Sequence, residues 1–301
     1  MTATGGTIAL SSSGNILGSV TVASGALTVG KPGAGNYLST AGGLYVTGAG
    51  VLAAGPGASA TIVGNIDYSS RASSTYSGQI SGSGSVLTLA AATGTTLTLS
   101  GTASSTFGGI AIQGGMLKIA NSAALTNNPL AIDGGTLDLG GLANVALASL
   151  TGDGGTIETS SGTSTLVVSP SAGTTSVYSG SIIDGAGMVS LLKEGAGELI
   201  LSGSDSFSGG TTVADGLLDI GNTQALPYGG SLTVGSGGTF ACGVGILPAS
   251  SGVGVSPASV ILPASATAGS RAGQHHALVY FPMECGDLSP LSDTSTVTHT
   301  S

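Results

Sequence analysis

Apolar and polar residues alternate in short runs along the first part of the chain, up to Cys242, and glycines separate the runs. In Thr96–Ser100, for example, Leu97 and Leu99 stand between hydroxyl-bearing residues. A period of two predicts β-strands that turn one face inward and the other to solvent. No window shows the 3.6-residue period of an amphipathic helix, and glycine interrupts every candidate. The pattern therefore predicts an all-β protein.

The apolar positions of these strands recur at a nearly regular interval. Two series show it: Leu117, Leu137 and Ile157 are evenly spaced, and Ile8, Leu27 and Leu44 follow at slightly shorter steps. An interval of about 20 residues is typical of one turn of a β-solenoid, so each series is expected to occupy equivalent inward positions. The neighbouring residues Lys118, Asp138 and Asp219 are expected to face outward. Roughly twelve turns over residues 1–242, with about 4.8 Å between strands, predict a rod about 55–60 Å long.

A longer repeat is superimposed on this interval. The segment 193–220 has an earlier counterpart, in which Leu97–Gly101 corresponds to Leu199–Gly203 and Gly115–Ile119 to Gly216–Ile220. Self-similarity in nearly constant register indicates a repeat protein. The long repeats span about 76–140 and 178–242.

The later copy resembles the autotransporter-associated β-strand repeat, which occurs in the passenger regions of large bacterial surface proteins. The positions that match its pattern are Gly185, Gly187, Lys193, Gly195, Gly197, Leu199, Leu201, Ser202, Gly203, Phe207, Gly209, Gly210, Thr211, Val213, Gly216 and Leu218. The earlier copy, from Gly82 to Ile119, is degenerate and lacks the Lys-x-Gly-x-Gly core. The resemblance implies a right-handed parallel β-helix that is exported to the cell surface, and it implies no chemistry.

The sequence changes character near Cys242. Residues 1–242 are expected to form the parallel β-helix, 243–270 a linker rich in Pro, Ala and Ser, and 271–301 an irregular or disordered tail. His275, His276, Glu284 and Cys285 form a cluster of potential metal ligands in that tail, but their spacing matches no standard zinc pattern. We therefore expect no metal and no cofactor.

Composition and charge narrow the possible partners. The chain has 14 acidic and 5 basic residues, a net charge of −9, so it lacks the basic surface that binding to nucleic acid requires. No apolar run approaches the ~20 residues of a membrane helix, and the N-terminus has no signal-peptide pattern. The resemblance nevertheless implies an extracellular or outer-membrane location, with the export signal and a translocation barrel encoded outside this chain.

Two acidic pairs are the candidates for catalysis. Asp133 and Asp153 are separated by one predicted turn, as are Asp138 and Glu158, so each pair is expected to stack about 5 Å apart on adjacent turns. That separation is near the one used by retaining glycosidases. However, residues 1–242 contain no His and a single Arg, Arg71, whereas pectinolytic enzymes on this fold use Arg, Lys or His beside the acids.

The sequence thus favours a structural or adhesive surface rod without catalytic activity, part of an autotransporter-like passenger. The expected partners are surface carbohydrate or other cell-surface proteins. The alternative is a carbohydrate-binding or carbohydrate-active β-helix that uses Asp133/Asp153 and Asp138/Glu158.

Overall fold

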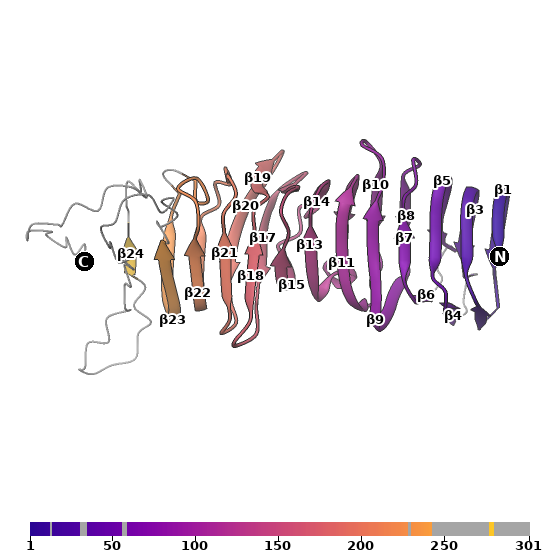
Figure 1. Ribbon diagram of the computed structural model, residues 1–301, viewed down its shortest axis with the longest axis horizontal. Coiled ribbons are helices and arrows are strands. Elements are labelled where there is room, and N and C mark those ends of the chain that lie inside the picture. Colours follow the sequence, from indigo (N-terminus) through magenta and orange to yellow (C-terminus); the bar gives the residue numbers. More distant parts are fainter. Residues whose placement is uncertain (13, 31–34, 56–58, 228–229, 243–276, 280–301) are drawn as a thin grey trace, which may run out of the picture.

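The protein is an elongated stack of short β-strands, as a computed structural model shows (Figure 1). The structure describes residues 1–242, except 13, 31–34, 56–58 and 228–229, and in addition Ala277–Val279. The predicted linker (243–270), most of the predicted tail (271–301), and the candidate ligands His275, His276, Glu284 and Cys285 lie outside the described residues.

Strands account for nearly all of the regular structure. In the first half they are β1 (Thr2–Leu10), β2 (Asn15–Leu17), β3 (Val20–Val29), β4 (Gly35–Thr40), β5 (Leu44–Ala54), β6 (Ser59–Val63), β7 (Ile66–Tyr68), β8 (Ser74–Tyr76), β9 (Gln79–Ala90), β10 (Thr96–Leu99), β11 (Thr106–Gly114) and β12 (Met116–Ile119). A single 3₁₀ turn, η1 (Ser122–Ala124), is the only helical element among the described residues. The second half contains β13 (Thr126–Ile132), β14 (Thr136–Asp138), β15 (Asn144–Thr151), β16 (Thr156–Thr159), β17 (Thr163–Val168), β18 (Thr175–Tyr178), β19 (Ser181–Gly185), β20 (Met188–Lys193), β21 (Glu198–Leu201), β22 (Thr211–Ile220), β23 (Leu232–Cys242) and β24 (Ala277–Val279).

The strands pair in parallel with strands of the next turn, and this pairing makes the chain a β-solenoid. One ladder passes through Val20, Leu44, Ile66 and Leu87, and continues through Ile110, Leu130 and Leu150. A second passes through Leu97, Leu117, Leu137, Ile157 and Ile182. A third passes through Val145, Leu166, Leu191, Thr211 and Leu232. About ten turns result, fewer than predicted, and only β24 pairs in the antiparallel sense among the described strands. The predicted parallel β-helix is confirmed.

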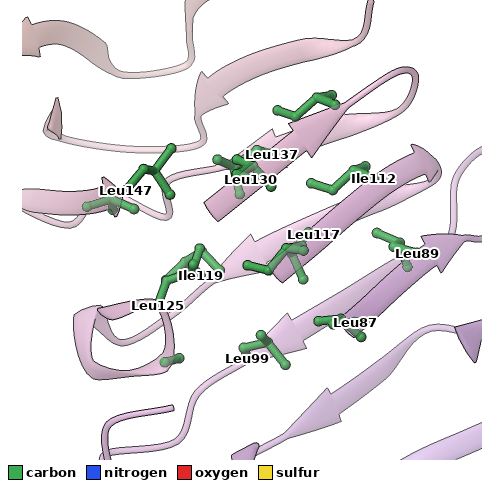
Figure 2. Packing of buried hydrophobic residues seen from close by; sticks show 14 of the residues in the cluster. Leu87, Leu89, Leu99, Ile112, Leu117, Ile119, Leu125, Leu130, Leu137 and Leu147 are labelled. Atoms are coloured by element: carbon green, nitrogen blue, oxygen red, sulfur yellow. The ribbon is translucent and has the colours of Figure 1, made fainter. Parts of the chain in front are cut away.

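The core is a continuous column of aliphatic side chains inside the coil. Leu117, Leu137 and Ile157 are each 0% exposed and occupy the same position on successive turns, as their even spacing predicts. Figure 2 shows the column between β9 and β15, with leucines and isoleucines of successive turns stacked on one another. Burial of each such side chain contributes about 1.5–3 kcal/mol, so the column is the main source of stability.

The predicted series Ile8, Leu27 and Leu44 is correct for its first step and wrong for its second. Ile8 pairs with Leu27 as expected, but Leu27 pairs with Leu52, and Leu44 pairs with Val20 on a different ladder. The turn that runs from Leu27 to Leu52 is therefore longer than the predicted interval. A constant interval cannot locate the rungs where turn length varies.

No helix in the described part of the chain has the length and apolar character needed to cross a membrane.

Candidate functional site

The acidic pairs predicted from the sequence lie on adjacent turns, as expected. Asp138 on β14 is in register with Glu158 on β16. Asp133 and Asp153 occupy the bends that follow β13 and β15, both are exposed, and the backbone N–H of Asp153 donates to Oδ1 of Asp133 at 3.4 Å. The structure therefore brings each pair together.

Asp138 lies on the outward side of β14, in register with Lys118 and Glu158, as predicted, but its side chain is buried rather than exposed. Its side chain is 1% exposed because Gly140, together with Ser160 and Lys118 of the neighbouring turns, surrounds the carboxylate. Oδ1 accepts the backbone N–H groups of Gly140 (2.8 Å) and Ser160 (2.9 Å), and Oδ2 lies 3.0 Å from Nζ of Lys118. The carboxylate thus connects three successive turns.

These contacts determine the charge state of Asp138. Burial alone would raise the pKa of this carboxyl, but the hydrogen bonds from Gly140, Lys118 and Ser160 outweigh burial and hold the pKa below its usual value. A general acid needs a pKa near the working pH. Asp138 is instead an ionised group whose oxygens are engaged by its own and neighbouring turns, which is an arrangement suited to joining turns.

The substitution Asp138→Asn tests this structural role. Asparagine keeps an acceptor for Gly140 and Ser160 but loses the charge opposite Lys118, so we expect a loss of about 1 kcal/mol at neutral pH. A lowered carboxyl pKa contributes stability above the unfolded-state pKa and loses it as the pH falls through the folded-state value. The difference between Asp138→Asn and the unmodified chain in urea unfolding should therefore stay constant from about pH 7 to about pH 5 and shrink as the pH falls below about 4. The exposed Asp133→Asn is the control, and an equal loss there would contradict the assignment.

Metal binding finds no support in the part of the chain that the structure describes. No group of three or more His, Cys, Asp or Glu residues comes together there in a way that could hold an ion.

A second polar centre lies inside the later repeat, at Lys193. This residue ends β20 at an inward position and is 0% exposed. Its Nζ donates to the backbone carbonyls of Glu194 (2.8 Å), Gly195 (2.7 Å) and Asp215 (3.0 Å). Burial lowers the pKa of Lys193, and the negative charge of Asp215 opposes that shift. Lys193 therefore supplies hydrogen-bond donors to three carbonyl groups of two adjacent turns.

The sequence identified Lys193 as a repeat position but gave it no role. The signal that could have assigned one is the alternation of β20, in which Val189 and Leu191 point inward and Lys193 follows two residues later. Gly216 explains part of the surrounding pattern: its φ is +68°, and a Cβ there would lie 2.3 Å from the Gly195 carbonyl oxygen and 2.8 Å from Nζ of Lys193. Glycine is required because φ is positive and the backbone carbonyl oxygens of Gly195 and Gly197 occupy that space.

The Leu-Ser-Gly part of the repeat marks a close approach between turns. A Cβ on Gly203 would lie 1.8 Å from the carbonyl oxygen of Gly180 on the preceding turn. Tyr178, which is 0% exposed, packs its ring over Gly180 and donates its hydroxyl to the Gly155 carbonyl at 3.3 Å. The earlier repeat has the same arrangement in Tyr76, Gly78 and Gly101.

The fold defines a class of protein, the β-solenoid, and its two repeats share the tyrosine and glycine positions at which adjacent turns approach closely. Comparison with protein families agrees with the repeat seen in the sequence. The model described as passenger-associated-transport-repeat matches residues 93–119 and 191–220, which contain β10, β11 and β12 in the earlier copy and β21 and β22 in the later one. The chain therefore carries an autotransporter passenger repeat in two copies. Searches of curated proteins and of solved structures found no match.

Proposed function

We propose that the chain is a structural and adhesive rod, part of an autotransporter-like passenger, that works at the cell surface without catalytic activity. The observation that carries the proposal is the use of the charged residues inside the repeats. Asp138 and Lys193 direct their hydrogen bonds to the backbone of their own and adjacent turns. A solenoid of this kind presents long lateral faces, which suit extended contacts with surface carbohydrate or with another cell-surface protein.

The outward rows of hydroxyl-bearing residues support binding of a ligand rather than catalysis. Thr136 and Thr156 are in register on β14 and β16, and Thr165 and Ser190 join their hydroxyls at 2.9 Å across β17 and β20. Hydroxyl groups held in rows can exchange hydrogen bonds with a polar ligand, but without a nearby base they are weak nucleophiles.

One experiment separates the rod from a carbohydrate-active enzyme. The purified full chain is incubated with neutral and acidic polysaccharides and assayed for new reducing ends, beside Asp133→Asn and Asp138→Asn. We expect no turnover by any of the three. Turnover that the substitutions abolish would overturn the proposal in favour of catalysis by the acidic pairs.

Adhesion is tested with beads that carry the chain, applied to immobilised glycans and to cell surfaces. We expect saturable attachment that heat-unfolded chain does not compete away. If the beads attach to none of these surfaces, the adhesive part of the proposal is contradicted and the chain serves only as a spacer. The matched control is bead-bound Leu218→Asp, a variant expected to lose its local stacking.

A further inference from the structure

The loop between β21 and β22, residues 202–210, is held against the preceding turn by the side chains of two aspartates, Asp205 in the loop and Asp184 on β19. The two carboxyl groups differ in charge state. The loop contains no strand, yet Asp205 and Phe207 inside it are buried, at 8% and 1% exposed. Backbone bonds to Ile182 and Val189 hold it: Ser206 N–H donates to the Ile182 carbonyl (2.9 Å) and Gly209 N–H to the Val189 carbonyl (2.8 Å). The side-chain contacts of Asp205 and Asp184 complete the attachment.

Asp205 uses only one of its two oxygens. Oδ1 accepts the backbone N–H of Ile182 at 2.7 Å, while Oδ2 is buried and has no hydrogen-bond partner within the described residues. An ionised carboxylate in this position leaves charge on a desolvated oxygen, which is unfavourable. A protonated, neutral carboxyl group lowers that cost. Burial accordingly raises the pKa of Asp205 to about 7, against the opposing effect of the Ile182 hydrogen bond.

Asp184 holds the other end of the loop in the opposite charge state. Its Oδ1 accepts the backbone N–H groups of Val189 (2.9 Å) and of Ser208 in the loop (3.0 Å). Burial acts to raise its pKa, but the hydrogen bonds from Ser208 and Val189 outweigh it and lower the pKa. Tyr178 is the other titratable group that senses Asp205, since burial and then the charge of Asp205 raise its pKa, and its phenol stays neutral.

The earlier repeat provides an internal comparison without the carboxyl group. Ser105 takes the place of Asp205: its Oγ accepts the backbone N–H of Ile80 at 3.2 Å, and its own N–H donates to Ala123, as that of Asp205 donates to Gln224. Phe107 is buried there as Phe207 is here. The loop therefore needs a hydrogen-bond acceptor at this position but not a carboxyl group. Asp205 adds a titratable group to a structure that forms without one.

We propose that residues 202–210 are a pH-dependent latch, which stays closed while Asp205 carries its proton and opens, exposing Phe207, when that proton passes to solvent. Opening gives both carboxylate oxygens access to water and breaks the contacts to Ile182 and Asp184. The earlier repeat, with Ser105, stays closed over the same range.

The direction follows from the linkage between protonation and opening. In the open loop Asp205 has an ordinary carboxyl pKa near 4, so the closed state binds more protons between about pH 4 and about pH 7. Closure therefore weakens as the pH rises through that window and changes no further above it. Each pKa unit is a factor of ten, so the opening constant should rise by up to about 10³-fold. Asp184 acts only below about pH 4, where its protonation would release Ser208.

Hydrogen exchange of the full chain at the Ile182 and Ser206 amides tests the latch. After correction for intrinsic exchange, protection should fall as the pH rises from about 4 to about 8 in the unmodified chain and stay constant in Asp205→Ser. The reciprocal change Ser105→Asp should transfer the same pH dependence to the Ile80 amide. Equal pH profiles for the unmodified chain and Asp205→Ser would overturn the proposal. Carbon NMR of the Asp205 carboxyl group measures its pKa directly and needs no variant. An ordinary pKa near 4 would also overturn the latch proposal.

Discussion

Leu218→Asp is expected to unfold the last turns of the described solenoid and to lower the free energy of unfolding by several kcal/mol. Leu218 is 0% exposed, and it stacks in register between Leu199 on β21 and Phe240 on β23. An aspartate there removes apolar contacts on both sides and buries a carboxylate among apolar side chains. Each turn of a solenoid is stabilised by its neighbours, so the damage should spread from β22 to β21 and β23.

The measurement is thermal unfolding followed by circular dichroism, together with protease digestion mapped along the chain. The matched control is Leu217→Asp, one residue earlier on the same strand, whose partly exposed side chain points away from the column. We expect early cleavage between β21 and β23 in Leu218→Asp and little change in Leu217→Asp. Identical melting and digestion of the two variants would refute the inward assignment of Leu218.

The inward column could be predicted because it depends on a local rule. Alternation sets which face of a strand a residue occupies, and Leu117, Leu137 and Ile157 could be placed because successive turns there keep the same length. Leu44 could not be placed by the same rule. Nothing in the local sequence fixes how many residues a loop uses before the chain rejoins the ladder, and the turn from Leu27 to Leu52 is longer than the one before it.

The polar centres depend on contacts between turns, which alternation does not encode. The period of two correctly separates Asp138 from Leu137, but Ser160 and Lys118 of neighbouring turns then cover Asp138. Lys193 shows the converse, since a charged residue at an inward position contradicts the usual burial preference. It is tolerated because three carbonyl groups converge on Nζ, and that convergence exists only after the turns have stacked.

Lys193→Met is expected to destabilise the later repeat by about 2–4 kcal/mol, although methionine is the more apolar side chain of similar length. Two effects oppose each other. Removing the buried ammonium group relieves its desolvation, but the carbonyls of Glu194, Gly195 and Asp215 then lose their shared donor. The three contacts are only partly buried, so each carbonyl that loses its donor should cost about 1 kcal/mol, and the three together outweigh the gain from the apolar side chain.

Urea unfolding of Lys193→Met and of Lys118→Met measures the contrast. Lys118 is partly exposed, at 35%, and its ion pair with Asp138 should be worth less than about 1 kcal/mol to a side chain so accessible to water. In the earlier repeat, Ala91 occupies the position that Lys193 has in the later one. A Cβ on Gly115 would lie 2.7 Å from the Cβ of Ala91, so the earlier turn closes around a methyl group. A stability gain in Lys193→Met would mean that the later turn can close in the same way, and that the three carbonyl contacts do not decide its stability.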